Sequence, residues 1–229
     1  ERFQTMVFGF NDLDLGMNRW KTSGFTYPDS PMDRGKVVRS QEEMDSMPEY
    51  GRYRDVDGDG IAYRTLPGSG LDPILYRGTG HDEDGMYSED PQVYHDAMAR
   101  LKRKIDGARD HLPAPVIREE EKKDLGVIFY GSMENSIVEI DDMLEESGLS
   151  VSTCRVRALP LHSGVEDFVR RHDKTIVLEI NRDGQLFGII RKEFPAELIP
   201  KIHSVSYSDG MPPRARVYSD MIQEVLEGL

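Results

Sequence analysis

From residue 126 onward, short apolar runs alternate with segments whose apolar residues recur every three or four positions. The runs have the length of buried strands, and the intervening segments have the period of amphipathic helices. Strands that alternate with helices predict the α/β fold class, with a small, mostly parallel sheet flanked by helices. The expected strands are residues 126–130, 153–159, 175–180 and 205–207; the expected helices begin at Ser132 and Ser163, follow the loop 181–185, and cover residues 214–227.

The first half of the chain is far less regular. Residues 21–80 are rich in Gly, Pro, Asp and Ser, which favour turns. A long irregular connection of this kind usually lines a functional surface or wraps another domain. A helix is predicted over residues 91–110, opened by Pro91, with the basic stretch 100–104 on its solvated face. Its apolar stripe is expected to be Val93, Ala97, Leu101, Ile105 and Ala108.

The chain begins with what reads as a helix end that runs directly into an apolar strand, Met6–Phe10. A single strand cannot pair its backbone groups or bury both faces. We therefore expect this strand to complete the sheet of an upstream domain, and the chain to be the C-terminal portion of a larger protein. A charged run at residues 118–124 indicates a second boundary, before the regular α/β domain.

Composition restricts the function classes. The 229 residues carry a net charge of −13, from 29 basic and 42 acidic residues, which makes nucleic acid an unexpected partner. No apolar run approaches membrane-spanning length, and no signal peptide is visible, so neither a membrane nor secretion is predicted. The single cysteine, Cys154, cannot form an internal disulfide or hold an iron–sulfur cluster alone, and is expected to be buried. The cytoplasm is the expected compartment.

Three carboxylates, Asp55, Asp57 and Asp59, stand at alternate positions before Gly60. Their oxygens could converge on a hard cation such as Ca²⁺, because glycine permits the sharp turn between them. The loop is not a complete EF-hand, since its twelfth position is Leu66 instead of Glu. A turn stabilised by its own side-chain hydrogen bonds is the alternative interpretation, and both stay open.

Other candidate residues lie in loops. The carboxyl ends of parallel strands form the usual binding crevice, which here means loops 131–132, 160–162 and 181–185. Asn181, Arg182 and Gln185 suit either ligand contact or a hydrogen-bond cluster between domains or subunits. His81, beside three acidic residues, is either a surface histidine or a proton-transfer residue. No order of Ser, His and Asp or of Cys and His indicates a nucleophile, so His81 is the one candidate for a catalytic role.

Seven stretches, in order, resemble the alpha subunit of 2-oxoacid:ferredoxin oxidoreductases, most closely the 2-oxoglutarate type. Together they cover nearly the whole chain. They are NDLDLGMNRW (11–20), DRGKVV (33–38), GRYRDVDGDGIAYRTLPG (51–68), RGTGHDEDG (77–85), YGS (130–132), RALP (157–160) and EINRDGQ (179–185).

The resemblance implies a thiamine-diphosphate-dependent oxidative decarboxylation of a 2-oxoacid, yielding CO₂ and an acyl-coenzyme A with electrons passed to ferredoxin. It also implies that thiamine diphosphate, Mg²⁺ and the iron–sulfur cluster are held mainly by a beta subunit or by upstream alpha-subunit domains. The residues agree with this expectation. Gly58-Asp59-Gly60 resembles the start of a thiamine diphosphate motif, but no asparagine follows some thirty residues later.

The family's architecture then gives the expected domains. Residues 1–25 are the tail and last strand of a pyrimidine-type thiamine-binding domain, and residues 26–122 are the wrapping connection. Residues 123–229 form a transketolase C-terminal-like domain. The resemblance implies roles in subunit assembly and in lining the site where coenzyme A arrives. The residues expected to line it are Asn181, Arg182 and Gln185, followed by Thr79 and His81.

Two other functions remain possible from the sequence. A non-catalytic, acidic, calcium-binding interaction module would explain Asp55, Asp57 and Asp59 and the net charge. A free-standing nucleotide-binding α/β protein is disfavoured, because neither G-x-G-x-x-G nor a P-loop is present.

Overall fold

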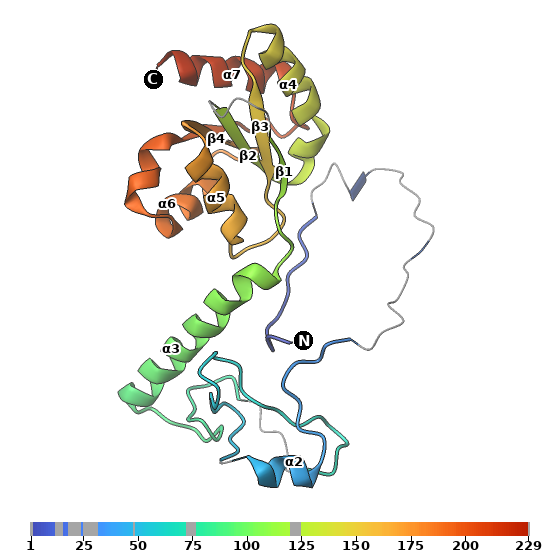
Figure 1. Cartoon of the computed structure of the whole chain (residues 1–229), viewed down its shortest axis with the longest axis vertical. Coiled ribbons are helices and arrows are strands. Elements are labelled where there is room, and N and C mark those ends of the chain that lie inside the picture. The colour runs from blue at the N-terminus through green and yellow to red at the C-terminus, as the bar shows by residue number, and fades with distance from the viewer. Residues whose placement is uncertain are drawn as a thin grey trace. The chain divides into compact units, whose positions relative to one another are not determined.

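The computed structural model describes residues 2–11, 16–17, 24, 32–47, 49–71, 77–119 and 125–228. The chain divides into two compact units (Figure 1). The N-terminal unit consists of Glu1–Phe8 and Lys21–Ala108, and the C-terminal unit of Gly9–Trp20 and Arg109–Leu229. The predicted domain boundaries, at residues 25–26 and 122–123, lie outside the described residues.

The C-terminal unit is built on a five-stranded sheet in the order β1-β3-β2-β4-β5. Strands β2, β3, β4 and β5 are parallel to one another, and β1 pairs antiparallel with β3 at one edge. The predicted α/β class with a mostly parallel sheet is confirmed. The strands are β1 Val116–Arg118, β2 Leu125–Phe129, β3 Val151–Arg155, β4 Lys174–Glu179 and β5 Ile202–Ser206.

Helices cover both faces of this sheet (Figure 1). Helices α4 and α7 pack on one face, and α5 and α6 on the other. Ser132 does not cap a helix as predicted: it is buried in a 3-10 turn, and α4 starts five residues later. The elements are η2 Gly131–Asn135, α4 Ile137–Glu146, α5 Ser163–Arg171, α6 Gln185–Glu193, η3 Ala196–Lys201 and α7 Ala215–Glu227.

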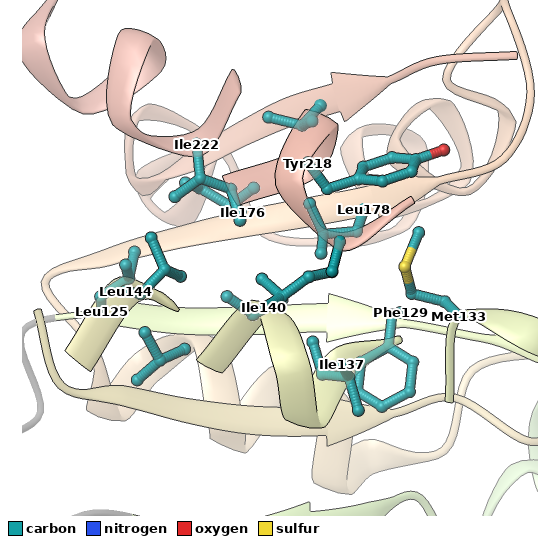
Figure 2. Close-up of a cluster of buried hydrophobic side chains, with 14 residues drawn as sticks. Leu125, Phe129, Met133, Ile137, Ile140, Leu144, Ile176, Leu178, Tyr218 and Ile222 are labelled. Atoms are coloured by element: carbon teal, nitrogen blue, oxygen red, sulfur yellow. The ribbon is translucent and has the colours of Figure 1, made fainter. Parts of the chain in front are cut away.

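Strands β2, β3, β4 and β5 each supply both cores, because successive side chains of a strand point to opposite faces. Figure 2 shows the core under α4 and α7, where Ile140 and Leu144 lie opposite Ile176, Leu178 and Tyr218. The other core packs Ile128, Cys154 and Val177 against α5 and α6. The prediction that Cys154 is buried is confirmed. Each fully buried large apolar side chain contributes about 1.5–3 kcal/mol, so these two cores fix the sheet and hence the loops at its edge.

The N-terminal unit contains two described helices, α2 Gln41–Ser46 and α3 Pro91–Ala108. Ser40 caps α2 by accepting a hydrogen bond from the Glu43 amide, and the Glu43 carboxylate accepts one from the Arg39 amide. Much of the rest of this unit is turns, with short bridges between Val37 and Arg64 and between His81 and Tyr87. Among the described residues, no helix is long and apolar enough to cross a membrane.

Helix α3 buries most of the predicted stripe at least in part: Val93, Ala97 and Leu101 are half-buried and Ala108 is buried. Ile105 is 38% exposed, whereas Lys104, in the stretch expected to face solvent, is buried together with Ala108. The reason is a backbone contact that hydropathy cannot reveal. Gly60 lies so close to α3 that a Cβ atom there would stand 2.5 Å from the Lys104 amide nitrogen and 2.6 Å from the Arg100 carbonyl oxygen.

Met6, Val7, Phe8 and Phe10 are all strongly exposed, between 72% and 95%, and residues 6–10 form no strand in the structure. The expectation was that this segment pairs with a sheet outside the chain, so it stays a prediction.

Gly60 and Gly58 provide a matched test of the contact with α3. Both have a positive φ, 83° and 76°, but nothing lies within 4 Å of the Cβ position of residue 58. Gly58→Ala is expected to cost about 1 kcal/mol of unfolding free energy, from the backbone conformation alone. Gly60→Ala adds the clash with α3 and is expected to cost about 3 kcal/mol or more. Urea unfolding followed by circular dichroism measures both, and equal losses would contradict the contact.

Candidate functional site

The loop after β4 is organised by a buried carboxylate. Glu179, the last residue of β4, is 1% exposed. Its Oε2 accepts hydrogen bonds from the Leu186 amide at 2.7 Å and from Asn181 Nδ2 at 2.8 Å, and its Oε1 accepts one from the Phe187 amide at 2.9 Å. These amides belong to the first turn of α6. The carboxylate therefore fills the position where the positive end of a helix would otherwise attract an external anion.

Asn181 is equally committed to the loop. Its Oδ1 accepts hydrogen bonds from the amides of Asp183, Gly184 and Gln185, at 3.0, 2.8 and 3.4 Å. Gly184 has φ of +61°, next to two serine hydroxyls that lie 3.1–3.2 Å from where its Cβ would be. The Asn181 side chain thus shapes the loop, and the groups it leaves facing solvent are Arg182 and Gln185.

Arg182 is the exposed cation of this loop. Its side chain is 87% exposed and is paired with neighbouring Asp183, with Nε 2.7 Å from Oδ1. An exposed pair of this kind contributes little to stability, so it can be exchanged for another anion at small cost. The predicted residues Asn181, Arg182 and Gln185 therefore divide into one that builds the loop and two that face outward.

Tyrosines surround the loop and stay neutral at physiological pH. Tyr130, which directly follows β2, accepts a hydrogen bond from Asn181 Nδ2 at 3.2 Å. Burial, and then the nearby Glu179 charge, raise the pKa of Tyr130. Burial raises the pKa of Tyr218 to about 12, and its hydroxyl donates to the backbone carbonyls of Glu179 and Tyr207. These phenols therefore support the loop by hydrogen bonding, and the site is suited to recognising a ligand.

The loop 160–162 also serves a helix end. His162 Nδ1 accepts a hydrogen bond from the Gly164 amide at 3.0 Å and so caps α5. Ser163 Oγ donates to Asp110 at 2.7 Å, and His162 Nε2 lies 3.9 Å from the same carboxylate oxygen. Because the serine hydroxyl donates to Asp110, His162 does not activate it as a nucleophile.

His81 and Thr79 lie in the other unit. His81 lines a cleft of about 510 Å³ together with Tyr53, Arg54, Arg100 and Arg103 and several acidic residues. Its ring stacks on Tyr53 at 3.9 Å between centroids, and its Nδ1 lies 2.8 Å from the Asp82 carbonyl oxygen. That contact indicates that Nδ1 carries the proton, which leaves Nε2 as the ring's acceptor. Thr79 is exposed.

The three aspartates meet cations of the chain itself. Lys36 Nζ lies 2.6 Å from Asp57 and 2.8 Å from Asp59, and Arg103 lies 2.9 Å from Asp55. Asp55 also accepts from the Gly60 amide, and Asp59 from the Ile61 amide. Within the described ranges, no group of three or more His, Cys, Asp and Glu residues is arranged to hold a metal ion. The geometry favours the turn stabilised by its own side chains, and metal binding there stays a prediction.

Sequence reasoning missed a cluster of buried cations. Arg52 and Lys104 are each 8% exposed, and Arg100 is half-buried beside them. Burial lowers the pKa of Lys104, and the charges of Arg100 and Arg52 lower it further. Lys104 Nζ and Arg52 Nη1 both donate to Gln4, at 3.4 and 3.1 Å. Nothing in the local sequence distinguishes these cations from an ordinary solvated helix face.

The sequence of this chain is similar to that of a curated protein. No family model matches the chain. It is 29% identical over 199 residues to the curated 2-oxoacid:ferredoxin oxidoreductase 2, subunit alpha, of Aeropyrum pernix. The match covers 83% of this chain and 30% of that protein. The chain is therefore similar in sequence to an alpha subunit of a 2-oxoacid:ferredoxin oxidoreductase. The resemblance expected from its seven ordered motifs is confirmed.

A solved structure shows the same fold. It is the 2-oxoglutarate:ferredoxin oxidoreductase from Magnetococcus marinus, with 2-oxoglutarate, coenzyme A and succinyl-CoA bound. The TM-score is 0.66 at 23% identity, over 79% of this chain and 31% of that one. The chain therefore spans about a third of the length of both relatives.

Replacing Glu179 tests the organisation of the site. Glu179→Gln puts an amide NH₂ against backbone N–H groups and leaves at least one of them without an acceptor. The expected cost is about 2–3 kcal/mol of unfolding free energy, measured by urea denaturation. The exposed Glu146, on α4, is the matched control, and Glu146→Gln is expected to change stability by less than about 0.5 kcal/mol. Equal small effects would show that the carboxylate does not hold the loop.

Lys36 gives a pH-dependent prediction. Burial alone would lower the pKa of Lys36, but its hydrogen bonds to Asp57 and Asp59 outweigh burial and raise that pKa. Burial alone would raise the pKa of Asp59, but hydrogen bonds from Lys36 and from the Ile61 amide lower that pKa. The pair therefore stabilises the fold between the ordinary Asp and Lys pKa values, and this stabilisation is lost as pH falls through the lowered pKa of Asp59. Lys36→Met is expected to cost about 0.5–1 kcal/mol at pH 7 and much less at a pH below the lowered pKa of Asp59.

Urea titrations at the two pH values measure this difference, with the exposed Lys192→Met as control. Calorimetric titration with Ca²⁺ tests the opposite interpretation, in which the aspartates bind a metal ion. Micromolar binding to the wild-type chain would mean that the metal displaces Lys36 from the aspartates.

Proposed function

We propose that this chain is part of the alpha subunit of a thiamine-diphosphate-dependent 2-oxoacid:ferredoxin oxidoreductase that acts on 2-oxoglutarate in the cytoplasm. The observation that carries the proposal is the match to the Aeropyrum pernix alpha subunit over 83% of the chain. The 2-oxoglutarate, coenzyme A and succinyl-CoA in the structural relative support the choice of substrate.

The proposed reaction converts a 2-oxoacid and coenzyme A into an acyl-coenzyme A and CO₂. It releases two electrons, which pass one at a time to ferredoxin, and one proton. Thiamine diphosphate supplies the bond-breaking chemistry, and an iron–sulfur cluster carries the electrons. We assign the ligands of both, and of Mg²⁺, to a beta subunit and to upstream alpha-subunit domains. This chain's share is assembly surface and part of the site wall.

Arg182 is the residue we place first at the coenzyme A site. Coenzyme A carries several phosphate charges, and a guanidinium is well suited to bind phosphate oxygens. Arg182 stands at the carboxyl end of the parallel strands, in a loop whose backbone Glu179 and Asn181 hold rigid. Gln185 offers an exposed amide next to it, and Asn181 acts as a positioning residue for both. Thr79 and His81 come second in this assignment.

Co-purification tests the proposed function as a whole. The chain, expressed with its genomic neighbours, is expected to purify with a polypeptide that carries a thiamine diphosphate motif and four cluster cysteines. The complex is expected to reduce ferredoxin when given 2-oxoglutarate and coenzyme A. Decarboxylation of a 2-oxoacid by this chain alone would refute the proposal.

Alanine substitution in that complex tests the residues. Arg182→Ala is expected to raise the KM for coenzyme A about tenfold and leave the KM for 2-oxoglutarate unchanged, because one charge-assisted contact of about 1.4 kcal/mol is lost. Lys192→Ala is the control, since this exposed cation lies in the last turn of α6, away from the loop. His81→Ala is expected to act in the same direction and more weakly. Unaltered coenzyme A kinetics and assembly in both variants would discard these assignments.

A further inference from the structure

The strand order of the C-terminal unit singles out one place on its sheet. Strands β2 and β4 are parallel neighbours, and β3 lies on the other side of β2. The connection after β2 leads into α4, on one face of the sheet, and the connection after β4 leads into α6, on the opposite face. In open parallel sheets, ligands bind outside the carboxyl ends of neighbouring strands whose connections leave to opposite faces. This switch point lies here between the ends of β2 and β4.

Tyr130 and Asn181 meet at the switch point. Tyr130 directly follows β2, and Asn181 comes two residues after the end of β4. Asn181 Nδ2 donates to the Tyr130 hydroxyl at 3.2 Å, which holds the phenol in place, while 37% of Tyr130 stays exposed. In the described part of the chain, no other ring and no guanidinium group stacks on Tyr130. The switch point therefore offers a positioned aromatic ring to a ligand.

Two exposed arginines follow the strands on either side of this ring. Arg182, in the loop after β4, has a side chain that is 87% exposed. Arg157 follows β3, where the preceding Val156 amide donates to the Phe129 carbonyl at 2.8 Å, so this segment runs beside the end of β2. Arg157 is exposed and, within the described ranges, forms no ion pair. Because neighbouring strands are about 4.8 Å apart, β3 and β4 end about 10 Å apart, with Tyr130 between them.

Carboxylates near these residues already have partners. Glu179 accepts hydrogen bonds from the first amides of α6, Asp183 pairs with Arg182, and Glu134 pairs with Arg155 at 2.9 Å. Because Glu179 takes those amides, a phosphate at this edge must be bound by side chains instead of by a helix start. The arrangement suits a ligand that carries a flat ring between two separate phosphate groups.

We propose that Tyr130 stacks on the adenine ring of coenzyme A, and that Arg157 and Arg182 each bind one of its two phosphate groups, the 3′-phosphate and the 5′-diphosphate. An aromatic side chain can stack on the face of a base, and a guanidinium matches the geometry of phosphate oxygens. The inference rests on the proposed function and deepens it. It assigns the nucleotide end of coenzyme A, and not its thiol end, to this chain.

Two substitutions of Tyr130 in the complete complex separate stacking from support of the loop. Tyr130→Ala removes the ring and is expected to raise the KM for coenzyme A about tenfold. Tyr130→Phe keeps the ring but loses the hydrogen bond from Asn181, and is expected to retain most of the affinity. The KM for 2-oxoglutarate is expected to stay the same in both variants. Equal increases in the KM for coenzyme A would show that Tyr130 only supports the loop, and would overturn the proposal.

Calorimetric titration of the complex tests the phosphate contacts by binding alone. The wild-type complex is expected to bind adenosine 3′,5′-bisphosphate in competition with coenzyme A. Arg157→Ala and Arg182→Ala are each expected to weaken coenzyme A binding about tenfold, and the control Lys192→Ala to leave it unchanged. With dephospho-coenzyme A, which lacks the 3′-phosphate, one arginine substitution is expected to lose its effect and the other to keep it. If both keep it or both lose it, the assignment is wrong.

The remaining outcomes distinguish this site from the proposed function. ATP binding that leaves the KM for coenzyme A unchanged would make this a site for a free nucleotide and overturn the assignment. A wild-type complex that binds the bisphosphate but forms no acyl-coenzyme A refutes the proposed function, and the assignment to coenzyme A falls with it. A complex that forms acyl-coenzyme A with an unaltered KM in the Tyr130→Ala and both arginine variants overturns the nucleotide site alone.

Discussion

The geometry of the candidate site depends on one buried charge. Removing a carboxylate from water costs several kcal/mol, and Glu179 recovers that cost only because two helix amides and the Asn181 side chain converge on it. This arrangement has a functional consequence. In many α/β proteins the first turn of a helix that follows a strand binds a phosphate. In α6 the Glu179 carboxylate of the same chain already occupies this place. The cation that this loop leaves exposed is Arg182.

The N-terminal unit buries positive charges, whereas the candidate site buries a negative one. Arg52 and Lys104 are buried in the N-terminal unit, whereas the aspartates that look like a metal loop pair with less buried cations: Asp57 and Asp59 face Lys36, and Asp55 faces the exposed Arg103. The same turn brings Gly60 against the backbone of α3. The aspartate–glycine turn, residues 55–60, thus holds α3 in place. A metal at this place would have to displace two cations that already satisfy the carboxylates.

Much of the C-terminal unit could be predicted from the sequence, and the reasons for the misses are physical. Strands such as β4 and helices such as α5 were found because a buried sheet covered on both faces imposes apolar runs and a helical period. The three-residue strand β1 is too short for such a signal. The burial of Lys104 on α3 was missed because its partner is a turn some forty residues away that uses a glycine and hydrogen bonds instead of apolar contact. Asn181 was placed correctly, but only the hydrogen bonds show that its side chain is used within the loop.

The two units suggest how chemistry and assembly are linked in this chain. Groups that face outward from the C-terminal loop are polar and suit a charged ligand, whereas those on α3 and residues 6–8 are apolar and suit a protein partner. Exposed apolar groups of this size tend to cause aggregation unless a partner covers them, and a net charge of −13 opposes that tendency by repulsion. The acidic surface thus opposes self-association of the apolar groups that the chain exposes.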